Sequence, residues 1–446
     1  MLPNSLKKSI LFLFVSLAGL MFVRAQESTP TFLVIQSLED AWDYAHKHNP
    51  NLQQYQLQQR KAEADYKAAQ AYKLPQISGS FSLQNNTSLA TTPLPGEIFG
   101  QPGETVDAQF GQQYTYNAGI TISKNLLDQK SRLQAKMTQQ NSLYLSQQTV
   151  VFEQALKEQV ALYYYTALVA EKALRISQQD LRLADSIATI SKQKREEGLI
   201  DQLALNQSLI NRNNISQNII QYESLLDQCQ QELRKLWGTS FSTDLKFTEE
   251  VKNTLPVLGL SMDMQTDASV KLSEIELEQA DIQVNMEKAA YLPTLTINSY
   301  WGKQQFRDDF GLSFSNSAWN DYSYISFGLQ VPIFNGFATK NKVKAAKIER
   351  DIAYQEWVDT RRTSEIEDTF LLEEYQRSWS LLTTSYENYQ LFETNSVLTF
   401  QKYEEGLLSL DASLKAFEDY LQSENSYLNN LSTLYSHYAS IISRNP

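Results

Sequence analysis

The chain has 446 residues, and its mean hydropathy of −0.41, with 42% hydrophobic residues, excludes both a polytopic helical membrane protein and a disordered chain. The formal net charge of −12 argues against nucleic-acid binding, because an acidic chain repels phosphates. Only 15 glycines and 11 prolines interrupt the chain, which favours long helices. The acidic balance fits either plain solubility or an anionic lumen.

The N-terminus has the pattern of a secretory signal peptide. Lys7 and Lys8 precede an apolar run of about 14 residues, and Ala25 is a small residue at a plausible cleavage position. The run is shorter than the roughly 20 residues that a membrane-spanning helix needs. We therefore expect residues 1–25 to be removed, with an uncleaved anchor as the alternative. No cysteine follows the cleavage position, so no N-terminal lipid anchor is expected, and the single Cys229 cannot form an intrachain disulfide.

Short segments recur in the same order in the two halves of the chain. Lys73-Leu-Pro resembles Tyr291-Leu-Pro at an offset of 218, and Lys194-Arg-Glu-Glu-Gly-Leu resembles Lys402-Tyr-Glu-Glu-Gly-Leu at an offset of 208. Such matches at nearly one offset predict an internal two-fold repeat. The predicted domains are a first repeat, a linker and a second repeat, at 26–240, 241–265 and 266–446.

Each half is predicted to contain a helix, two strands around a polar loop, and two further helices. In the first half these lie at 38–72, 77–84, 85–113, 114–122, 129–197 and 201–237. In the second half they lie at 267–291, 295–300, 303–321, 324–331, 338–405 and 411–443. The strands alternate apolar and polar residues, so each has one apolar face. We expect membrane β-hairpins at about 76–123 and 294–332, because strands of 8–10 residues can cross a bilayer when tilted.

The hairpins cannot stand alone in lipid, because edge strands leave backbone groups unpaired at several kcal/mol each. Four strands are also too few to close a pore, so several chains must share one wall. Aromatic rings near the strand ends suit a membrane–water interface, or alternatively a soluble core. These candidates are Tyr114, Tyr116, Tyr300, Trp301, Trp319, Tyr322 and Tyr324.

The order of these motifs resembles the TolC-like outer-membrane efflux family over nearly all of residues 37–443. The matching segments are Ser37-Leu-Glu-Asp-Ala-Trp, Asn49-Pro-Asn-Leu, the two Leu-Pro segments, Val331-Pro-Ile-Phe-Asn-Gly and the two Glu-Glu-Gly-Leu segments. The resemblance implies a mainly α protein with membrane β-structure. It implies long α-helical barrel hairpins of coiled-coil type and a homotrimeric β-barrel of twelve strands, four from each chain.

The resemblance also assigns a role to the Glu-Glu-Gly-Leu segments, which end the long helices. From the residues alone, glycine followed by leucine predicts a helix C-terminus with a left-handed cap. In the family these tips contact a periplasmic adaptor protein. The implied docking residues are Glu196, Glu197, Gly198, Leu199, Glu404, Glu405, Gly406 and Leu407.

Related channels narrow their periplasmic end with acidic side chains, often an aspartate six positions after the tip glycine. Ala204 and Ala412 occupy those positions here, which puts an aspartate ring of the usual kind in doubt. Asp201 and Asp411 are the remaining candidates for a lumen constriction. The alternative is that each caps the returning helix, as aspartate does well.

The sequence offers no pattern for catalysis, for a cofactor or for a metal. No phosphate loop, nucleophile elbow or paired cysteine ligands occur, and His46 and His48 point to different faces of a helix. The expected function is an outer-membrane exit duct of a tripartite efflux system that extends into the periplasm. Its expected partners are an adaptor, an inner-membrane transporter and outer-membrane lipid. Type I protein secretion and a coiled-coil scaffold without a pore are the alternatives.

Overall fold

The computed structural model describes residues 32–100, 102–241, 243–252 and 267–444. The predicted signal peptide at 1–25 and residues 253–265 of the predicted linker lie outside the described residues. The chain divides into two compact units, and each unit draws on both halves of the sequence. Among the described residues, unit 1 takes its segments from 32–50, 156–252 and 372–443, and unit 2 from 51–155, 267–371 and 444.

The first helical region is broken where the sequence predicted one continuous helix. Helix α2 runs from Leu38 to His48 and α3 from Pro50 to Ala69, followed by the 3-10 turn η1 at Gln70–Lys73. Asn49 is extended at the break, with φ −61° and ψ 120°, because the proline ring disfavours helical geometry in the residue before it. The Asn49 side chain is buried and its Nδ2 donates to the Leu236 carbonyl at 2.7 Å, which fixes the break against α5.

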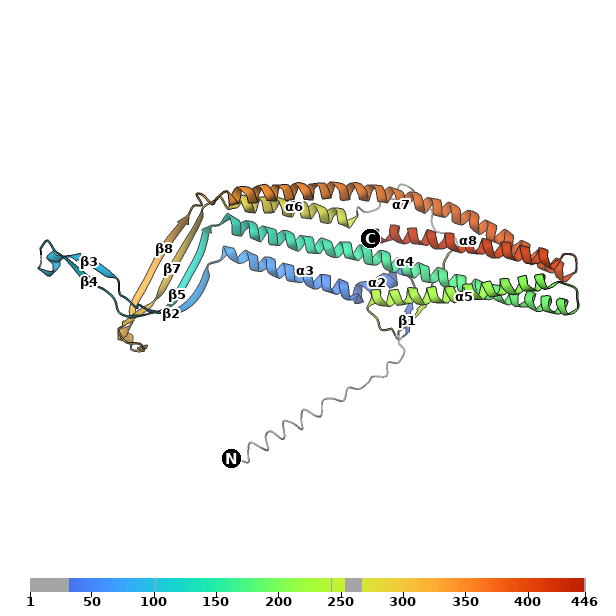
Figure 1. The fold of residues 1–446 in the computed structure, drawn as a ribbon, viewed down its shortest axis with the longest axis horizontal. Coiled ribbons are helices and arrows are strands. Elements are labelled where there is room, and N and C mark those ends of the chain that lie inside the picture. The colour runs from blue at the N-terminus through green and yellow to red at the C-terminus, as the bar shows by residue number, and fades with distance from the viewer. Residues whose placement is uncertain (1–31, 101, 242, 253–266, 445–446) are drawn as a thin grey trace, which may run out of the picture. The chain divides into compact units, whose positions relative to one another are not determined.

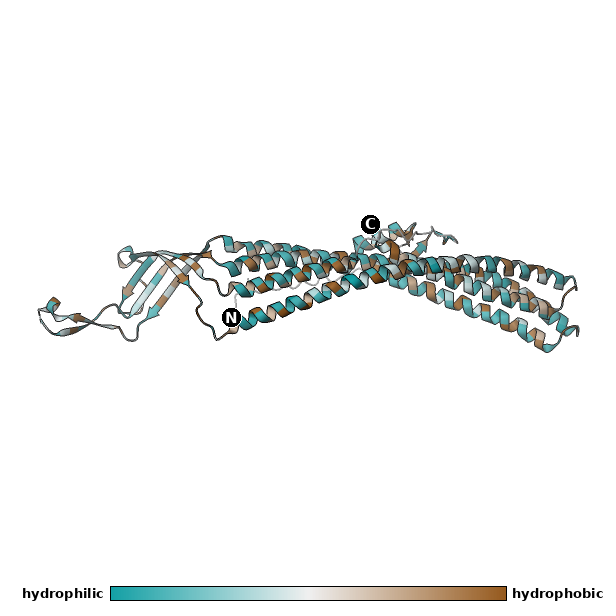
Figure 2. Cartoon of the chain, turned by 90° about the horizontal axis from the view of Figure 1, so that it is seen from above, coloured by the Kyte–Doolittle hydropathy of each residue, from teal (hydrophilic) through white to brown (hydrophobic). Residues whose placement is uncertain are grey.

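The remaining helices lie within two residues of their predicted bounds. They are α4 (Gln129–Glu196), α5 (Gln202–Trp237), α6 (Ala268–Ala289), α7 (Ala338–Glu404) and α8 (Leu410–Ser443). The long helices α4 and α7 each contribute to both units. Among the described residues, no helix is both long and apolar enough to cross a bilayer. Figure 2 shows the reason, since polar and apolar residues are interspersed along every helix.

Unit 2 contains a four-stranded antiparallel sheet (Figure 1). Its strands, in spatial order, are β2 (Gln76–Asn85), β5 (Tyr114–Leu127), β7 (Thr294–Arg307) and β8 (Asn320–Gln330). Strand β5 pairs with β7, so the sheet joins segments from the two halves of the chain. Each strand is next in sequence to a helical segment, which places the sheet directly on α4, α6, α7 and the turn after α3.

The first predicted loop, 85–113, contains a second small sheet that the sequence analysis missed. Strands β3 (Thr91–Pro95) and β4 (Thr105–Gln109) pair antiparallel around the 3-10 turn η2 (Gly96–Phe99). The two prolines are tolerated because a two-stranded ribbon leaves one edge of each strand without a partner. In the second loop, η3 (Asn316–Ala318) lies just before β8.

Unit 1 contains a further strand pair that the sequence did not predict. Strands β1 (Phe32–Ile35) and β6 (Asp244–Phe247) pair in parallel, and β6 falls within the predicted linker. Next to this pair lies a core centred on Trp237, which is fully buried and donates from Nε1 to the Ala41 carbonyl at 3.0 Å. The chain leaves α5 through Gly238, whose φ of +61° caps the helix.

Candidate functional site

The four-stranded sheet has one apolar and one polar face. The register pairs Ile77 with Ile122, Ile120 with Trp301, and Ile297 with Phe327, and since side chains alternate along a strand these residues share a face. That face is exposed, with Phe327 and Ile77 68% and 67% accessible. The opposite face carries mainly Ser, Thr, Asn, Gln and Gly. The sheet thus presents an apolar face and a polar face to its surroundings.

The polar face also carries a cluster of three tyrosines. The centroid of the Tyr300 ring lies 5.7 Å from the ring centroid of Tyr322 and 5.8 Å from that of Tyr324. Tyr300 is buried because it lies across Gly119 and Gly302, where a Cβ atom would approach within 2.6 Å of its ring or hydroxyl. The two glycines therefore allow the aromatic ring to lie flat on the sheet.

The register divides the seven predicted interface aromatics between the two faces. Tyr300, Tyr322 and Tyr324 lie on the polar face, and Trp301 lies on the apolar face because adjacent residues of a strand point oppositely. The three tyrosines thus lie on the face opposite Ile120, and their role at a membrane interface stays a prediction.

The other interface aromatics lie on the apolar face or beside the strands. Tyr114 and Tyr116 share the apolar-face register, and the Tyr116 hydroxyl accepts a 3.0 Å hydrogen bond from the Gly311 amide. Trp319, just before β8, donates from Nε1 to the Ser313 carbonyl at 2.8 Å. For these residues and Trp301, the role at a membrane interface stays a prediction.

The two Glu-Glu-Gly-Leu segments form the same turn in unit 1. At the end of α4, the Leu199 amide donates to the Lys194 carbonyl at 2.8 Å and the Gly198 amide donates to that of Arg195 at 3.1 Å. At the end of α7, the amides of Leu407 and Gly406 make the equivalent bonds at 2.8 and 3.0 Å. The glycines have φ of +75° and +74°, the left-handed geometry that this pair of bonds requires.

The turns expose apolar side chains together with charge. Leu199 and Leu407 are 66% and 69% accessible, and Glu196, Glu197, Glu404 and Glu405 are exposed around them. Leu203, one turn into α5, is 74% accessible and was missed by the sequence analysis. Its position after the tip could have indicated it, because an apolar residue close to a solvent-facing turn is a candidate contact.

The two candidate aspartates differ in their local roles. Asp201 caps α5, since its Oδ1 accepts from the Ala204 amide at 2.8 Å. Asp411 lies in the first turn of α8, where Ser409 Oγ accepts the capping bond from the Ala412 amide at 3.3 Å. Both aspartates are exposed. Asp201 thus caps α5, as the alternative interpretation predicted. Asp411 does not cap α8, because Ser409 accepts that hydrogen bond.

An apolar core lies directly beneath the tips. Tyr403, three residues before Gly406, is 4% exposed and packs with Ala204, Leu414 and Phe417. The Lys194 ammonium group lies 3.9 Å from the centroid of the Tyr403 ring, a cation–π contact that joins the end of α4 to the end of α7.

Deeper in unit 1, a pair of carboxyl groups is almost fully buried. Asp180 on α4 is 5% exposed and Glu424 on α8 is 3% exposed. Burial raises the pKa of Asp180, and burial together with a hydrogen bond to Asp180 raises the pKa of Glu424. Two bare charges would be costly there, so the pair holds a proton between them at neutral pH. Sequence reasoning missed this pair, because its members lie 244 positions apart in no motif.

The structure adds no metal centre to these features in the ranges it describes. No three His, Cys, Asp or Glu side chains among those residues approach one another as metal ligands would. Cys229 is buried, and its burial raises the pKa of the thiol to about 11.

Comparison with known proteins places the chain among outer-membrane proteins. The family model described as outer membrane efflux protein matches residues 42–239. The probable efflux pump outer membrane protein TtgC of Pseudomonas putida is 24% identical over 375 residues, covering 79% of this chain and 73% of TtgC. The probable outer membrane lipoprotein SilC of Salmonella typhimurium is 22% identical over 68% of this chain and 62% of SilC.

The fold agrees with these relationships. The Campylobacter jejuni CmeC outer membrane channel superposes with a TM-score of 0.75 at 18% identity, covering 91% of this chain and 85% of CmeC. This likeness shows the fold, in which a small sheet adjoins long helices. The family match over residues 42–239, the relatives and the fold agree, and each likens the chain to outer membrane efflux proteins.

Proposed function

We propose that the protein is an outer-membrane exit duct that conducts small molecules or ions out of the cell. The observation that carries this proposal is the two-faced sheet of unit 2, whose exposed apolar face suits lipid and whose polar face suits a water-filled lumen. TtgC is named as an efflux pump outer membrane protein, which favours efflux over type I protein secretion. The family consists of transport proteins, in keeping with the expectation of no enzymatic activity.

The duct is a homotrimer with a twelve-stranded barrel. Strands β2 and β8 lie at the two ends of the sheet order, so each has a strand neighbour on one side. In hydrocarbon each unpaired backbone group costs several kcal/mol, and joining β2 of one subunit to β8 of the next removes both edges. Three copies supply twelve strands, an even number in the range of membrane barrels. The two halves of each chain act as repeats, each supplying one membrane hairpin and one helical hairpin.

The tips dock a periplasmic adaptor, which links the duct to an inner-membrane transporter. The support for this role is the repetition of one turn geometry at Gly198 and Gly406, each with an exposed leucine and two exposed glutamates. Small apolar surfaces with a charged rim suit recognition of apolar side chains on a partner helix.

Asp411 narrows the lumen at the periplasmic end. Its carboxylate is exposed and is not needed to cap α8, whereas Asp201 is engaged as a cap. In a trimer, Asp411 brings three carboxylates to one level of the channel, which favours cations.

Planar-bilayer recording of the purified protein tests the duct. A trimer that conducts ions is the expected result, and a water-soluble monomer without membrane association would exclude the proposal and favour the scaffold alternative. Asp411→Ala should raise conductance and weaken block by divalent cations, while Asp201→Ala should mainly destabilise α5 by about 1 kcal/mol. Unchanged conductance and block in Asp411→Ala would refute the constriction alone.

A further inference from the structure

The junctions between strands and helices in unit 2 lie at one end of the sheet. The register pairs Gln76 at the start of β2 with Ser123 near the end of β5, and Thr294 at the start of β7 with Gln330 at the end of β8. Leu127 at the end of β5 pairs with Leu295. The turn after α3, the start of α4, the end of α6 and the start of α7 therefore all meet the sheet at this end (Figure 1).

These junctions are strongly basic in a chain whose net charge is −12. The stretches 66–76, 124–136, 287–294 and 331–348 contain eleven lysines and arginines but two acidic residues. We call the eleven the basic junction: Lys67, Lys73, Lys124, Lys130, Arg132, Lys136, Lys288, Lys340, Lys342, Lys344 and Lys347. The acidic total thus conceals a local excess of positive charge at the boundary between sheet and helices.

The helices themselves do not account for this charge. Neither α4 nor α7 has an acidic residue in its first turn, where the helix dipole favours one, and both have basic residues there instead. Elsewhere basic side chains pair with carboxylates, as Arg212 does with Asp185 at 2.6 Å. Among the described residues, none of the eleven side chains forms such an ion pair. All but the half-buried Lys124 are exposed. Their charge is therefore available to an anion.

A cleft in the basic junction is large enough to bind such an anion. It has a volume of about 530 Å³, with Lys73, Lys124 and Arg132 among its basic lining residues. Asp128 also lines it, but its carboxylate is engaged by Ser131 Oγ at 2.6 Å and by the Asn125 side chain at 2.9 Å. The cleft thus combines three cations with a carboxylate that is turned onto the start of α4.

The other wall of the cleft is apolar and continues the apolar face of the sheet. Leu126, Leu127 and Leu292 line it, and Lys124 follows Ile122 on that face. A ligand that carries a phosphate beside hydrocarbon matches both walls, and a phospholipid at the edge of a bilayer has that chemistry. Free phosphate would satisfy the cations but leave the leucines in water.

We propose that the basic junction binds anionic phospholipids, with one headgroup phosphate seated between Lys73, Lys124 and Arg132. The inference rests on the proposed membrane duct, because it needs the apolar face of the sheet to lie in a bilayer. The bound lipid belongs to the leaflet next to the helices. Its headgroups fix the depth of the sheet in the membrane through charge, in addition to the hydrophobic match.

Native mass spectrometry of the purified trimer tests this proposal, with phosphatidylglycerol and phosphatidylcholine as probes and inorganic phosphate as competitor. We expect phosphatidylglycerol to bind at least about tenfold more tightly than phosphatidylcholine, with a preference that weakens as salt rises. The variant Lys73→Gln/Lys124→Gln/Arg132→Gln should lose that preference. The control Lys192→Gln/Arg195→Gln/Lys402→Gln, which removes equal charge near the opposite ends of α4 and α7, should keep it.

Equal binding of the two lipids, or an equal loss in the control variant, would overturn the inference. Full displacement of phosphatidylglycerol by inorganic phosphate would overturn it in favour of a free-phosphate site. If the triple variant fails to assemble, the single variant Lys124→Gln and the salt titration of the unmodified trimer give the same decision. A conducting trimer without lipid preference refutes this inference alone, whereas a protein that forms no conducting trimer refutes the duct itself.

Discussion

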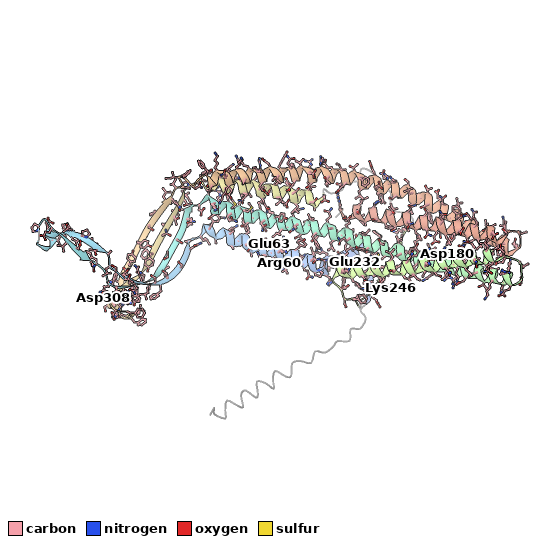
Figure 3. All side chains as sticks on the ribbon, viewed as in Figure 1. Arg60, Glu63, Asp180, Glu232, Lys246 and Asp308 are labelled. Carbon is pink, nitrogen blue, oxygen red and sulfur yellow. The ribbon has the colours of Figure 1, made fainter. Side chains whose placement is uncertain are left out.

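The Tyr420 hydroxyl donates a 3.0 Å hydrogen bond to Oδ1 of Asp180 and so joins α8 to α4 inside unit 1 (Figure 3, where Asp180 is labelled). Glu424 lies one turn beyond Tyr420 and completes a buried cluster of a phenol and two carboxyl groups. The charge of Glu424 also contributes to the raised pKa values of Tyr222 on α5 and Tyr389 on α7. Helices α4, α5, α7 and α8 thus each contribute a titratable group to one small region.

Stability should fall as pH rises through the titration of this pair. The folded-state pKa values of Asp180 and Glu424 are raised by burial, so the folded protein keeps a proton that the unfolded chain has released. The contribution is complete below the unfolded pKa of about 4 and is lost as pH rises through the raised folded value, at about 1.4 kcal/mol per pH unit for one proton. Thermal denaturation between pH 5 and 9 should show a shallower fall for Glu424→Gln. Identical slopes in the two proteins would refute the assignment.

Removing the Tyr420 hydroxyl should destabilise unit 1 with little change in shape. Tyr420→Phe leaves Asp180 Oδ1 without its donor inside the core, which costs about 1–3 kcal/mol. Chemical denaturation at pH 7 measures the loss. Tyr66→Phe, which changes a less buried tyrosine on α3, is the control and should be close to neutral. Equal effects of the two changes would mean that the hydrogen bond to Asp180 has no energetic weight.

The tip turns should depend on the backbone of glycine and not on space around it. A Cβ at Gly406 meets no atom within 4 Å, but its φ of +74° is unfavourable for alanine by about 1 kcal/mol. Gly406→Ala should therefore speed hydrogen–deuterium exchange at 402–410. Gly79→Ala, at a position without positive φ and with equal space, serves as the control for substitution itself. Unaltered exchange at the tip would show that the turn tolerates the strain.

The glycines beneath Tyr300 should show the opposite dependence, on space. At Gly119, a Cβ would lie 2.6 Å from the Tyr300 ring and 2.8 Å from the Trp301 carbonyl oxygen. Gly119→Ala should lower sheet stability by about 1–3 kcal/mol, seen as a lower temperature at which the proposed trimer dissociates in detergent. Gly328→Ala lies on the same face with nothing within 4 Å and should be much milder. Similar dissociation temperatures for both variants would contradict the packing of Tyr300.

Docking at the tips should require apolar surface on the turns. Leu199→Glu/Leu407→Glu places charge where two exposed leucines extend from the turns, so we expect affinity for the proposed adaptor to fall at least about tenfold, with the stability of the proposed trimer unchanged. Leu199→Met/Leu407→Met keeps the apolar surface and should bind nearly as well as the unmodified protein. Surface-based binding measurements with the purified adaptor compare the three. Full binding by the glutamate variant would exclude these leucines as contacts.

The sequence predicts the long helices well because their ends are set locally. Gly198 and Gly406 end α4 and α7 through backbone geometry that other residues rarely adopt, and Leu-Pro ends the helical segments before β2 and β7. The alternation of apolar residues likewise located all four strands of the larger sheet. Such signals act within a few residues and survive without knowledge of the rest of the chain.

Features that depend on distant partners escaped the sequence analysis. Strands β1 and β6 are four residues each, and each is a strand only because it pairs with the other. Asp180 and Glu424 look like solvated helix residues until α8 covers α4. The faces of Tyr300 and Trp301 depend on register, and a shift of one residue would exchange them. From the sequence, Asp201 could either narrow the lumen or cap a helix. The hydrogen bond that it accepts from the Ala204 amide shows that it caps α5.

The parallel pairing of β1 with β6 has a consequence for the order in which the chain acquires its structure. Phe32 pairs with Asp244, so this contact closes a loop of about 210 residues that includes all of α4 and α5. A contact over so long a sequence separation is entropically slow to form, and it requires that all of the intervening residues have been synthesised. Strand β1 thus stays unpaired while much of the first half folds, and a chaperone that shields extended segments would bind there.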